Sequence, residues 1–265
     1  MSGMVAQSGD IAGLGAGLAA ALAAGGAGLR LDLQPICAAT GLAPVGYEAL
    51  LRWDHPEFGP LGALDVIAAA EAAGRGVALD AWVMVNAFRL RAAWPRGAPW
   101  LAVNVSAAGL LGGHAAPMVR AALEATGVDP RGLVLELPEA AVVRDLGASQ
   151  ALAARLRGFG IAVALDDFGG ALGPARALRD IPFTAVKLDP AMTADLDGAG
   201  PMAARARAAV AAVVDLIHAL GATSVAEGVE CAGQMQALRA AGCDALQGWL
   251  LGRPGAGPSP QPQIR

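Results

Sequence analysis

The chain has 265 residues, of which 55% are hydrophobic and 16% are charged. This balance excludes an intrinsically disordered chain, and the length suits one large α/β unit, because barrels of alternating strands and helices commonly reach about 250 residues. The net charge of −4, with no run of Lys or Arg, argues against electrostatic binding of DNA or RNA.

The first predicted element is a helix within residues 11–29, an uncharged stretch rich in Ala and Gly. Its length raises the alternative of a membrane span. Leu14, Leu18 and Leu22 recur every four residues, however, which favours a soluble helix with one narrow apolar stripe. No basic region of a signal peptide precedes it, so we expect no membrane segment in this chain. Residues 1–13 and 255–265 are expected to be flexible tails around a barrel domain at 14–254.

Short apolar or β-branched runs bounded by Gly, Pro and polar residues predict eight strands. Most of them are separated by segments with helical spacing. The link CAATGLAP between the first two strands is too short for a crossover helix, so these strands should pair antiparallel. The pattern predicts an α/β fold, a TIM-like (β/α)8 barrel with an antiparallel first strand. The predicted strands are 29–36, 45–52, 100–105, 132–137, 161–166, 184–188, 223–227 and 243–247, and the predicted helices are 64–74, 80–94, 114–127, 146–158, 175–180, 201–220 and 231–241.

The cysteines and histidines form no metal or redox motif. Cys37, Cys231 and Cys243 are widely spaced and contain no CxxC pair, which favours a reducing, cytoplasmic location. His218 lies in a predicted helix rich in Ala, Leu and Val, and we expect it to be structural rather than a ligand.

Seven predicted strands carry polar side chains near one end, where the active sites of such barrels gather. Burying several unpaired carboxylates is strongly destabilising unless cations neutralise them, although any one acid could instead be a helix cap or a loop residue. Oxygen ligands without Cys or His favour Mg²⁺ or Mn²⁺, and two such ions can clamp a phosphodiester. The residues concerned are Glu48, Asn104, Glu136, Asp166 with Asp167, Lys187 (the single lysine of the sequence), Glu227 and Gln247.

Eight short motifs in order resemble those of EAL domains, a family that hydrolyses or binds cyclic di-GMP. Each motif alone is weak, but eight in order across residues 14–254 are specific. The motifs are QPI (34–36), YEALLRWDHP (47–56), VNVS (103–106), LELPE (135–139), LDDFG (165–169), VKLD (186–189), VAEGVE (225–230) and LQGWLLGRP (246–254).

The resemblance implies hydrolysis of one phosphodiester of cyclic di-GMP to linear pGpG, with one or two Mg²⁺ or Mn²⁺ ions. It also implies the residues that carry this chemistry. Glu48, Asn104, Glu136 and Asp166 would hold one ion, Asp167 would hold the second, Asp189 and Glu227 would assist around the metals, Lys187 would help activate the attacking water, Gln34 and Arg52 would contact the dinucleotide, and Gln247 would orient groups near the metals.

The chain departs from the family after its LDDFG motif. Family members that turn over well continue DDFGTGYSSL, whereas this chain has Gly and Ala with Leu172 and Pro174 in that loop. Pro138 replaces a Thr of the family, while Glu139, which steadies the loop, is retained. The resemblance therefore allows two functions, an active phosphodiesterase or a weak or inactive sensor of cyclic di-GMP that acts through a protein partner. A scaffold that binds no nucleotide is a third reading, and the loop and helix after Asp167 are where we expect a homodimer contact.

Overall fold

The structure is a computed structural model that describes residues 8–169 and 175–258. Eight strands form a closed barrel, because the end strands of the sheet, β1 and β2, also pair with each other. Their order around the barrel is β1-β9-β8-β7-β6-β5-β4-β2, and β3 extends β2 as a hairpin. The strands are β1 (Leu29–Ala38), β2 (Pro44–His55), β3 (Gly59–Leu61), β4 (Trp100–Asn104), β5 (Leu133–Pro138), β6 (Ala162–Phe168), β7 (Ala185–Leu188), β8 (Thr223–Ala226) and β9 (Ala245–Gln247).

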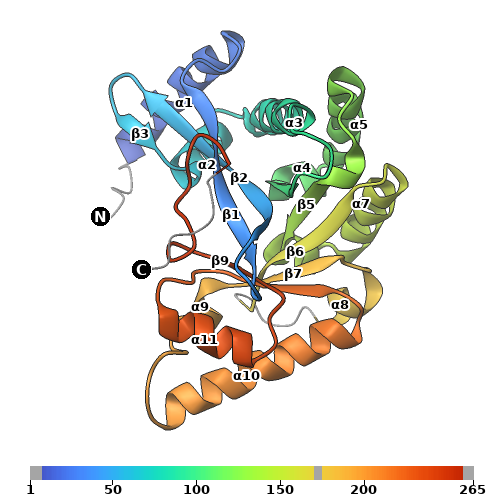
Figure 1. Ribbon diagram of the computed structural model, residues 1–265. Coiled ribbons are helices and arrows are strands. Elements are labelled where there is room, and N and C mark those ends of the chain that lie inside the picture. Colours follow the sequence, from blue (N-terminus) through green and yellow to red (C-terminus); the bar gives the residue numbers. More distant parts are fainter. Residues whose placement is uncertain (1–7, 170–174, 259–265) are drawn as a thin grey trace.

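Helices surround this barrel, and the long helix α10 lies outside the strands β7 and β8 (Figure 1). The predicted helices are all present within the described residues, and the structure adds the short helices α4, α6 and α9. The helices are α1 (Ser8–Ala23), α2 (Ala63–Ala72), α3 (Gly76–Ala92), α4 (Ala107–Leu111), α5 (Ala115–Thr126), α6 (Glu139–Arg144), α7 (Leu146–Gly158), α8 (Ala175–Asp180), α9 (Pro190–Thr193), α10 (Pro201–Ala219) and α11 (Ala232–Ala240), with a 3-10 turn at Pro130–Gly132.

The first strand runs antiparallel to both of its neighbours, as the short link predicts. Gln34 lies opposite Glu48 on β2, and Ile36 lies opposite Gln247 on β9. The other barrel pairings are parallel. One end of the barrel therefore collects polar side chains from β1, β2 and β9.

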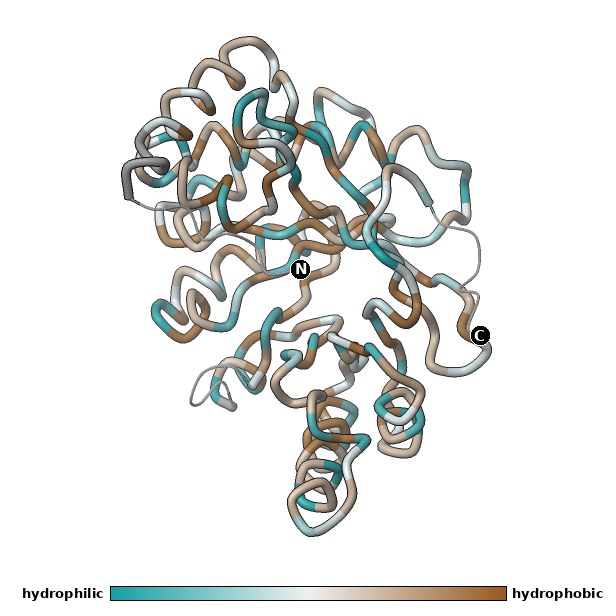
Figure 2. The backbone as a smooth tube through the Cα atoms, turned by 90° about the vertical axis from the view of Figure 1, so that its left-hand side faces the viewer, coloured by the Kyte–Doolittle hydropathy of each residue, from teal (hydrophilic) through white to brown (hydrophobic). Residues whose placement is uncertain are grey.

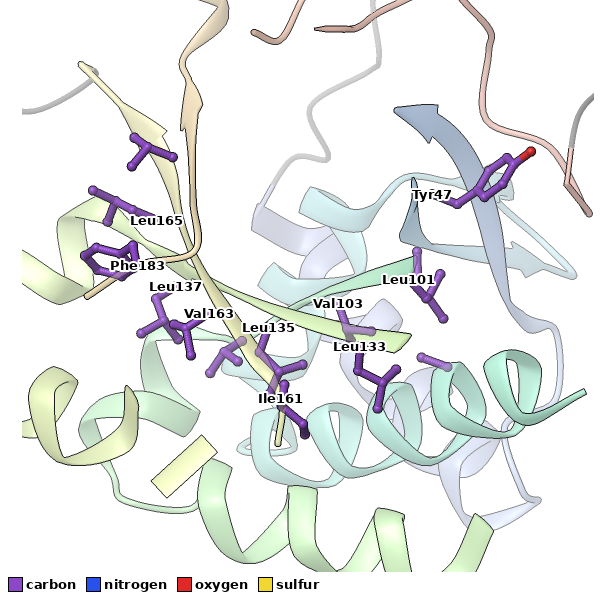
Figure 3. Packing of buried hydrophobic residues seen from close by; sticks show 14 of the residues in the cluster. Tyr47, Leu101, Val103, Leu133, Leu135, Leu137, Ile161, Val163, Leu165 and Phe183 are labelled. Carbon is purple, nitrogen blue, oxygen red and sulfur yellow. The ribbon is translucent and has the colours of Figure 1, made fainter. Parts of the chain in front are cut away.

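Strand alternation separates two packed layers. Leu135 and Leu165 belong to the main core cluster between the barrel and the helices, and Figure 3 shows members of this cluster from adjacent strands. Ala102, Val134 and Ala164 form a small separate cluster of mostly short side chains. Hydrophobic and neutral colours cover most of the backbone in Figure 2, in line with the low content of charged residues. The short side chains leave space for polar residues at the barrel end.

Helix α1 packs on the barrel domain through its leucine stripe. Leu14 and Leu18 are buried, Leu22 packs against the core, and α1 contacts α2. Within the described residues, no helix has the length and apolar character needed to cross a membrane. The helix begins at Ser8 and Gly255 pairs with Leu33, so ordered elements extend slightly past residues 14 and 254.

Asp244 ties the segment before β9 to β8 and α10. Its Oδ2 accepts hydrogen bonds from the Ser224 backbone N–H (2.7 Å) and hydroxyl (2.9 Å), and it lies 2.8 Å from His218 Nε2. Burial alone would raise the pKa of Asp244, but the hydrogen bonds from Ser224 and His218 outweigh it and hold that pKa below 3.8, its ordinary value. His218 therefore has a structural partner, away from the barrel end.

We expect Asp244→Ala to lower the free energy of unfolding by about 1–3 kcal/mol, because the buried Ser224 N–H loses its acceptor. Urea unfolding at pH 7 measures this, with the exposed Asp215→Ala as the control. Since folding depresses the pKa of Asp244, its contribution is present above pH 3.8 and disappears as the pH falls below it. Equal stability of the two variants at pH 7 would contradict this role.

Candidate active site at the barrel rim

The two adjacent aspartates reach the same site because β6 is irregular at its end. The pairing of β6 with β7 shifts register between Leu165 and Phe168. In a regular strand Asp166 and Asp167 would point to opposite faces. Asp167 instead has φ 58°, a left-handed conformation that Asp tolerates better than most residues. As a result, carboxylate oxygens of Asp166, Asp167 and Glu227 lie within 4.8 Å of one another.

Lys187 is the centre of this cluster and is only 2% exposed. Its ammonium group contacts carboxylates from four different positions around the barrel. Nζ lies 2.6 Å from Glu227 Oε1, 3.0 Å from Glu136 Oε1, 3.0 Å from Asp166 Oδ1 and 3.4 Å from Glu48 Oε2.

Glu48 is held by amide side chains on both of its oxygens. Asn104 Nδ2 donates to Oε1 at 2.8 Å, and Gln247 Nε2 donates to Oε2 at 2.6 Å. The same Gln247 nitrogen lies 3.1 Å from Gln34 Oε1, and Gln34 Nε2 donates to the Gly252 carbonyl at 3.2 Å. These bonds link β1, β2, β4 and β9, so the register of four strands fixes the position of one carboxylate.

Burial and mutual repulsion disturb the ionisation of these acids. Burial raises the pKa of Glu227 to about 8, and burial with the Asp166 charge raises the pKa of Asp167 to about 6. Burial also raises the pKa of Glu136 well above its usual range. Glu48 differs, because the Lys187 charge and the hydrogen bonds from Gln247 and Asn104 outweigh burial and lower its pKa. The carboxylates in turn raise the pKa of Lys187 against the effect of its burial.

The single positive charge of Lys187 cannot neutralise five neighbouring acids. A divalent cation can supply the missing positive charge. Glu136 Oε2 and Gln247 Oε1 are buried and have no hydrogen-bond partner among the described residues. The donors are oxygens of carboxylates and amides, a set that suits Mg²⁺ or Mn²⁺. The residues present therefore fit a divalent metal, with Asp166, Asp167 and Glu227 as the tightest group of oxygens.

A cavity of about 380 Å³ opens above this cluster. Such a volume is within the range of small-molecule sites. Eight of the predicted site residues line it, and Trp249, Pro190 and Glu230 line it as well, although they were not predicted as site residues. The full lining is Gln34, Glu48, Asn104, Asp166, Asp167, Lys187, Pro190, Glu227, Gly228, Glu230, Gln247, Gly248 and Trp249.

Four other predicted residues, Glu136, Arg52, Asp189 and the loop-positioning Glu139, lie off this lining. Glu136 lies deeper, at 1% exposure, under Lys187. Arg52 Nε lies 3.5 Å from Asp32 Oδ2, and its Nη1 donates to the Leu51 carbonyl. Asp189 caps helix α9, where its Oδ1 accepts the Ala191 N–H.

Glu139 contacts the beginning of the loop that follows β6. It is buried at the start of α6, and its Oε2 accepts the Gly169 N–H at 3.0 Å. Pro138, which stands in the place of the family Thr, lies opposite Asp166 in the β5–β6 pairing. Residues 170–174, which carry most of the sequence departure and the loop part of the predicted dimer contact, lie outside the described residues, whereas the helix part is α8.

The sequence profile of the EAL domain matches residues 18–254. The chain belongs to the EAL domain family. A relative from Pseudomonas aeruginosa, the bifunctional diguanylate cyclase/cyclic di-GMP phosphodiesterase MucR, is 35% identical over 229 residues, which are 85% of this chain and 33% of that protein. The cyclic di-GMP phosphodiesterase NbdA of the same organism is 36% identical over 229 residues, 85% of this chain and 29% of that protein. This EAL domain thus spans about a third of the length of both relatives.

Solved EAL structures share the fold. The MucR phosphodiesterase in complex with c-di-GMP superimposes with a TM-score of 0.85 at 33% identity, covering 92% of this chain and 98% of that one. The EAL domain of FimX from Pseudomonas aeruginosa, bound to c-di-GMP, gives a TM-score of 0.82 at 26% identity, covering 94% and 97%. The predicted barrel with an antiparallel first strand is thereby confirmed.

Proposed function

We propose that this EAL domain hydrolyses one phosphodiester of cyclic di-GMP to give linear pGpG. The observation that carries the proposal is the single lysine surrounded by buried acids under an open cavity, in a domain whose relatives include named cyclic di-GMP phosphodiesterases. An anionic phosphodiester could enter a site lined by Glu48, Asp166 and Glu227 only with cations present.

Mg²⁺ or Mn²⁺ ions, as one or two equivalents, would be held by Glu48, Asn104, Glu136, Asp166, Asp167 and Asp189 and would supply the positive charge that polarises the phosphate and the attacking water. Lys187 would donate hydrogen bonds to that water or to the phosphate, and it already holds the acids in one arrangement. Gln247 and Asn104 orient Glu48 through the bonds described above. Glu227 would assist around the metals and hold Lys187 in place, since its Oε1 lies 2.6 Å from the lysine Nζ.

Three further residues have proposed roles, Gln34 and Arg52 at the entry of the cavity and Glu139 at the loop after Asp167. Gln34 lines the cavity and would contact the dinucleotide. Arg52, four residues after Glu48 on the same face of β2, would reach it only after leaving Asp32. Glu139 would position the loop after Asp167 through the Gly169 N–H.

A second function, sensing of cyclic di-GMP with weak or no hydrolysis, is favoured by the altered loop sequence. Residues 170–175 are Gly, Ala, Leu and Pro, residue types whose side chains have no hydrogen-bonding groups, where active family members have Thr, Tyr and Ser. A metal ligand displaced by about 1 Å can lower a rate about 100-fold. A chain with a displaced Asp167 would still bind cyclic di-GMP and would lose only its hydrolysis.

Incubation of the purified chain with cyclic di-GMP separates the two functions. The phosphodiesterase produces pGpG with Mg²⁺ or Mn²⁺, stops when EDTA removes the ion, and resumes when the ion is restored. Glu48→Ala is the control for contaminating activity and yields no product above background. Nucleotide binding without pGpG would support the sensor, and no binding at all would leave only the scaffold reading.

We further propose a homodimer through the loop and helix α8 after Asp167, and a cytoplasmic location. Arg176 and Arg179 of α8 are largely exposed, which leaves this helix accessible to a second copy. The three cysteines are free thiols, as a reducing compartment requires. Light scattering that gives the mass of one chain would contradict the dimer.

A further inference from the structure

An exposed tryptophan stands at the edge of the proposed nucleotide cavity. Trp249 is 55% exposed, although most tryptophan side chains are largely buried. It lines the cavity together with Gly248 and Pro190, and among the described residues no other aromatic side chain does so. Single exposed apolar side chains are ordinary on protein surfaces, but Trp249 also lines the cavity, where its flat indole offers a face to a bound ligand.

The turn that carries Trp249 is rigid. The Val229 N–H donates to the Gln247 carbonyl at 3.0 Å, and the Leu250 N–H donates to the Val229 carbonyl at 3.0 Å. A Cβ atom on Gly248 would lie 2.2 Å from the Val229 carbonyl oxygen, so only glycine allows the two segments to approach this closely. The Gly252 carbonyl at the other end of the turn accepts the Gln34 bond. The backbone that carries the indole is therefore held against Val229 and Gln34.

Arg253 occupies one side of the indole. Its guanidinium carbon lies 4.5 Å from the Trp249 ring centroid, within the range of a cation–π contact. In the part of the chain that the structure describes, no carboxylate pairs with Arg253, so its charge is available at the edge of an acidic cavity. The arginine covers one face of the ring, leaves the other face open, and adds positive charge beside the cavity.

We propose that Trp249, braced by Arg253, is a stacking platform for one guanine base of cyclic di-GMP. The inference rests on the proposed substrate but not on its hydrolysis. Stacking on an indole uses the π face that every base has, so Trp249 contributes affinity and leaves the metal-dependent step unaffected. It is a binding residue, and its loss acts on KM rather than on kcat.

The test compares Trp249→Ala, Trp249→Phe and the wild type. Cyclic di-GMP affinity is measured by calorimetric titration with Ca²⁺, a divalent cation that takes oxygen ligands, after product analysis has shown that no pGpG forms during the titration, and KM and kcat are measured with Mg²⁺. We expect Trp249→Ala to raise Kd and KM by about 5- to 150-fold with kcat within about twofold, and Trp249→Phe to recover most of the affinity. Arg253→Ala is expected to show a smaller loss in the same direction. Thermal unfolding of all variants checks that the fold is intact.

Trp94→Phe is the matched control, because Trp94 also lies against an arginine, with Arg91 at 5.5 Å from its ring, but lies before β4 at the opposite end of the barrel. This variant should bind cyclic di-GMP like the wild type and keep any nucleotide-induced quenching of tryptophan fluorescence, which Trp249→Phe should lose. Unchanged affinity and KM in Trp249→Ala would overturn the platform while leaving the proposed function intact. A wild-type chain that neither binds nor hydrolyses cyclic di-GMP would overturn both.

Discussion

Replacing Lys187 by methionine is expected to lower the free energy of unfolding of the metal-free protein by about 3–5 kcal/mol. The reason is that the four carboxylates around Nζ would lose their only contacting cation among the described residues while remaining buried. Removing one member of a buried ionic network costs this much because the remaining charges stay out of water. Urea unfolding in EDTA measures the change.

Mg²⁺ or Mn²⁺ should recover part of this loss, because a divalent cation supplies positive charge to the same oxygens and stabilises only the folded chain. The control is Arg179→Met, which removes an exposed partner of Asp180 and should leave stability unchanged in either condition. Hydrolysis should be lost in Lys187→Met even when the metal restores the fold. A Lys187 variant as stable as the wild type in EDTA would contradict this prediction, because it would show that the acids are protonated or solvated when the lysine is absent.

Asp166→Asn and Asp167→Asn are each expected to reduce the production of pGpG by more than about 100-fold. Even residues that only orient metal ligands cost about 10- to 100-fold when mutated, and both aspartates present oxygens within the cluster. Asn is the informative replacement at 167, because it tolerates the left-handed backbone at φ 58° and removes only the charge. Initial rates at saturating metal and nucleotide measure the effect.

The two variants should differ in how metal concentration affects them. Asp166 lies in the regular part of β6, paired with Pro138, whereas Asp167 lies at the irregular end next to the altered loop. We therefore expect excess Mn²⁺ to restore part of the rate of Asp167→Asn and none of the rate of Asp166→Asn. Full turnover in either variant would exclude that aspartate as a ligand.

Much of the rim could be predicted from the sequence, because parallel strands end at one edge of a barrel and each strand shows where its apolar run stops. Asn104, the last residue of β4, follows this logic, whereas Glu48 interrupts the apolar run of β2; a direct hydrogen bond joins the two side chains. Asp167 does not, since alternation alone would direct it away from Asp166. Only the register shift in β6 and the left-handed backbone of Asp167 bring it to the site. Neither feature can be predicted from the alternation of apolar and polar residues.

The sequence also did not predict how deeply a site residue is buried or which side chain it pairs with. Glu136 is placed correctly at its strand end but lies beneath Lys187, because the short side chains inside the barrel leave room for the lysine above it. Arg52 shares its face of β2 with Glu48, yet its ion pair with Asp32 depends on the antiparallel register of β1. Trp249 follows Gln247 and Gly248 without any periodic pattern, so its exposure beside the cavity could be known only from the fold.

The central claim is that the carboxylates of separate strands tolerate one another at the barrel rim by sharing divalent cations. A crystal structure of the chain soaked with Mn²⁺ and cyclic di-GMP, with anomalous scattering recorded for manganese, tests it most directly. We expect one or two manganese peaks among Glu48, Asn104, Asp166 and Asp167, with a phosphate of the nucleotide beside them. Nucleotide in the cavity with no manganese at these residues, or manganese bound elsewhere on the chain, would contradict it.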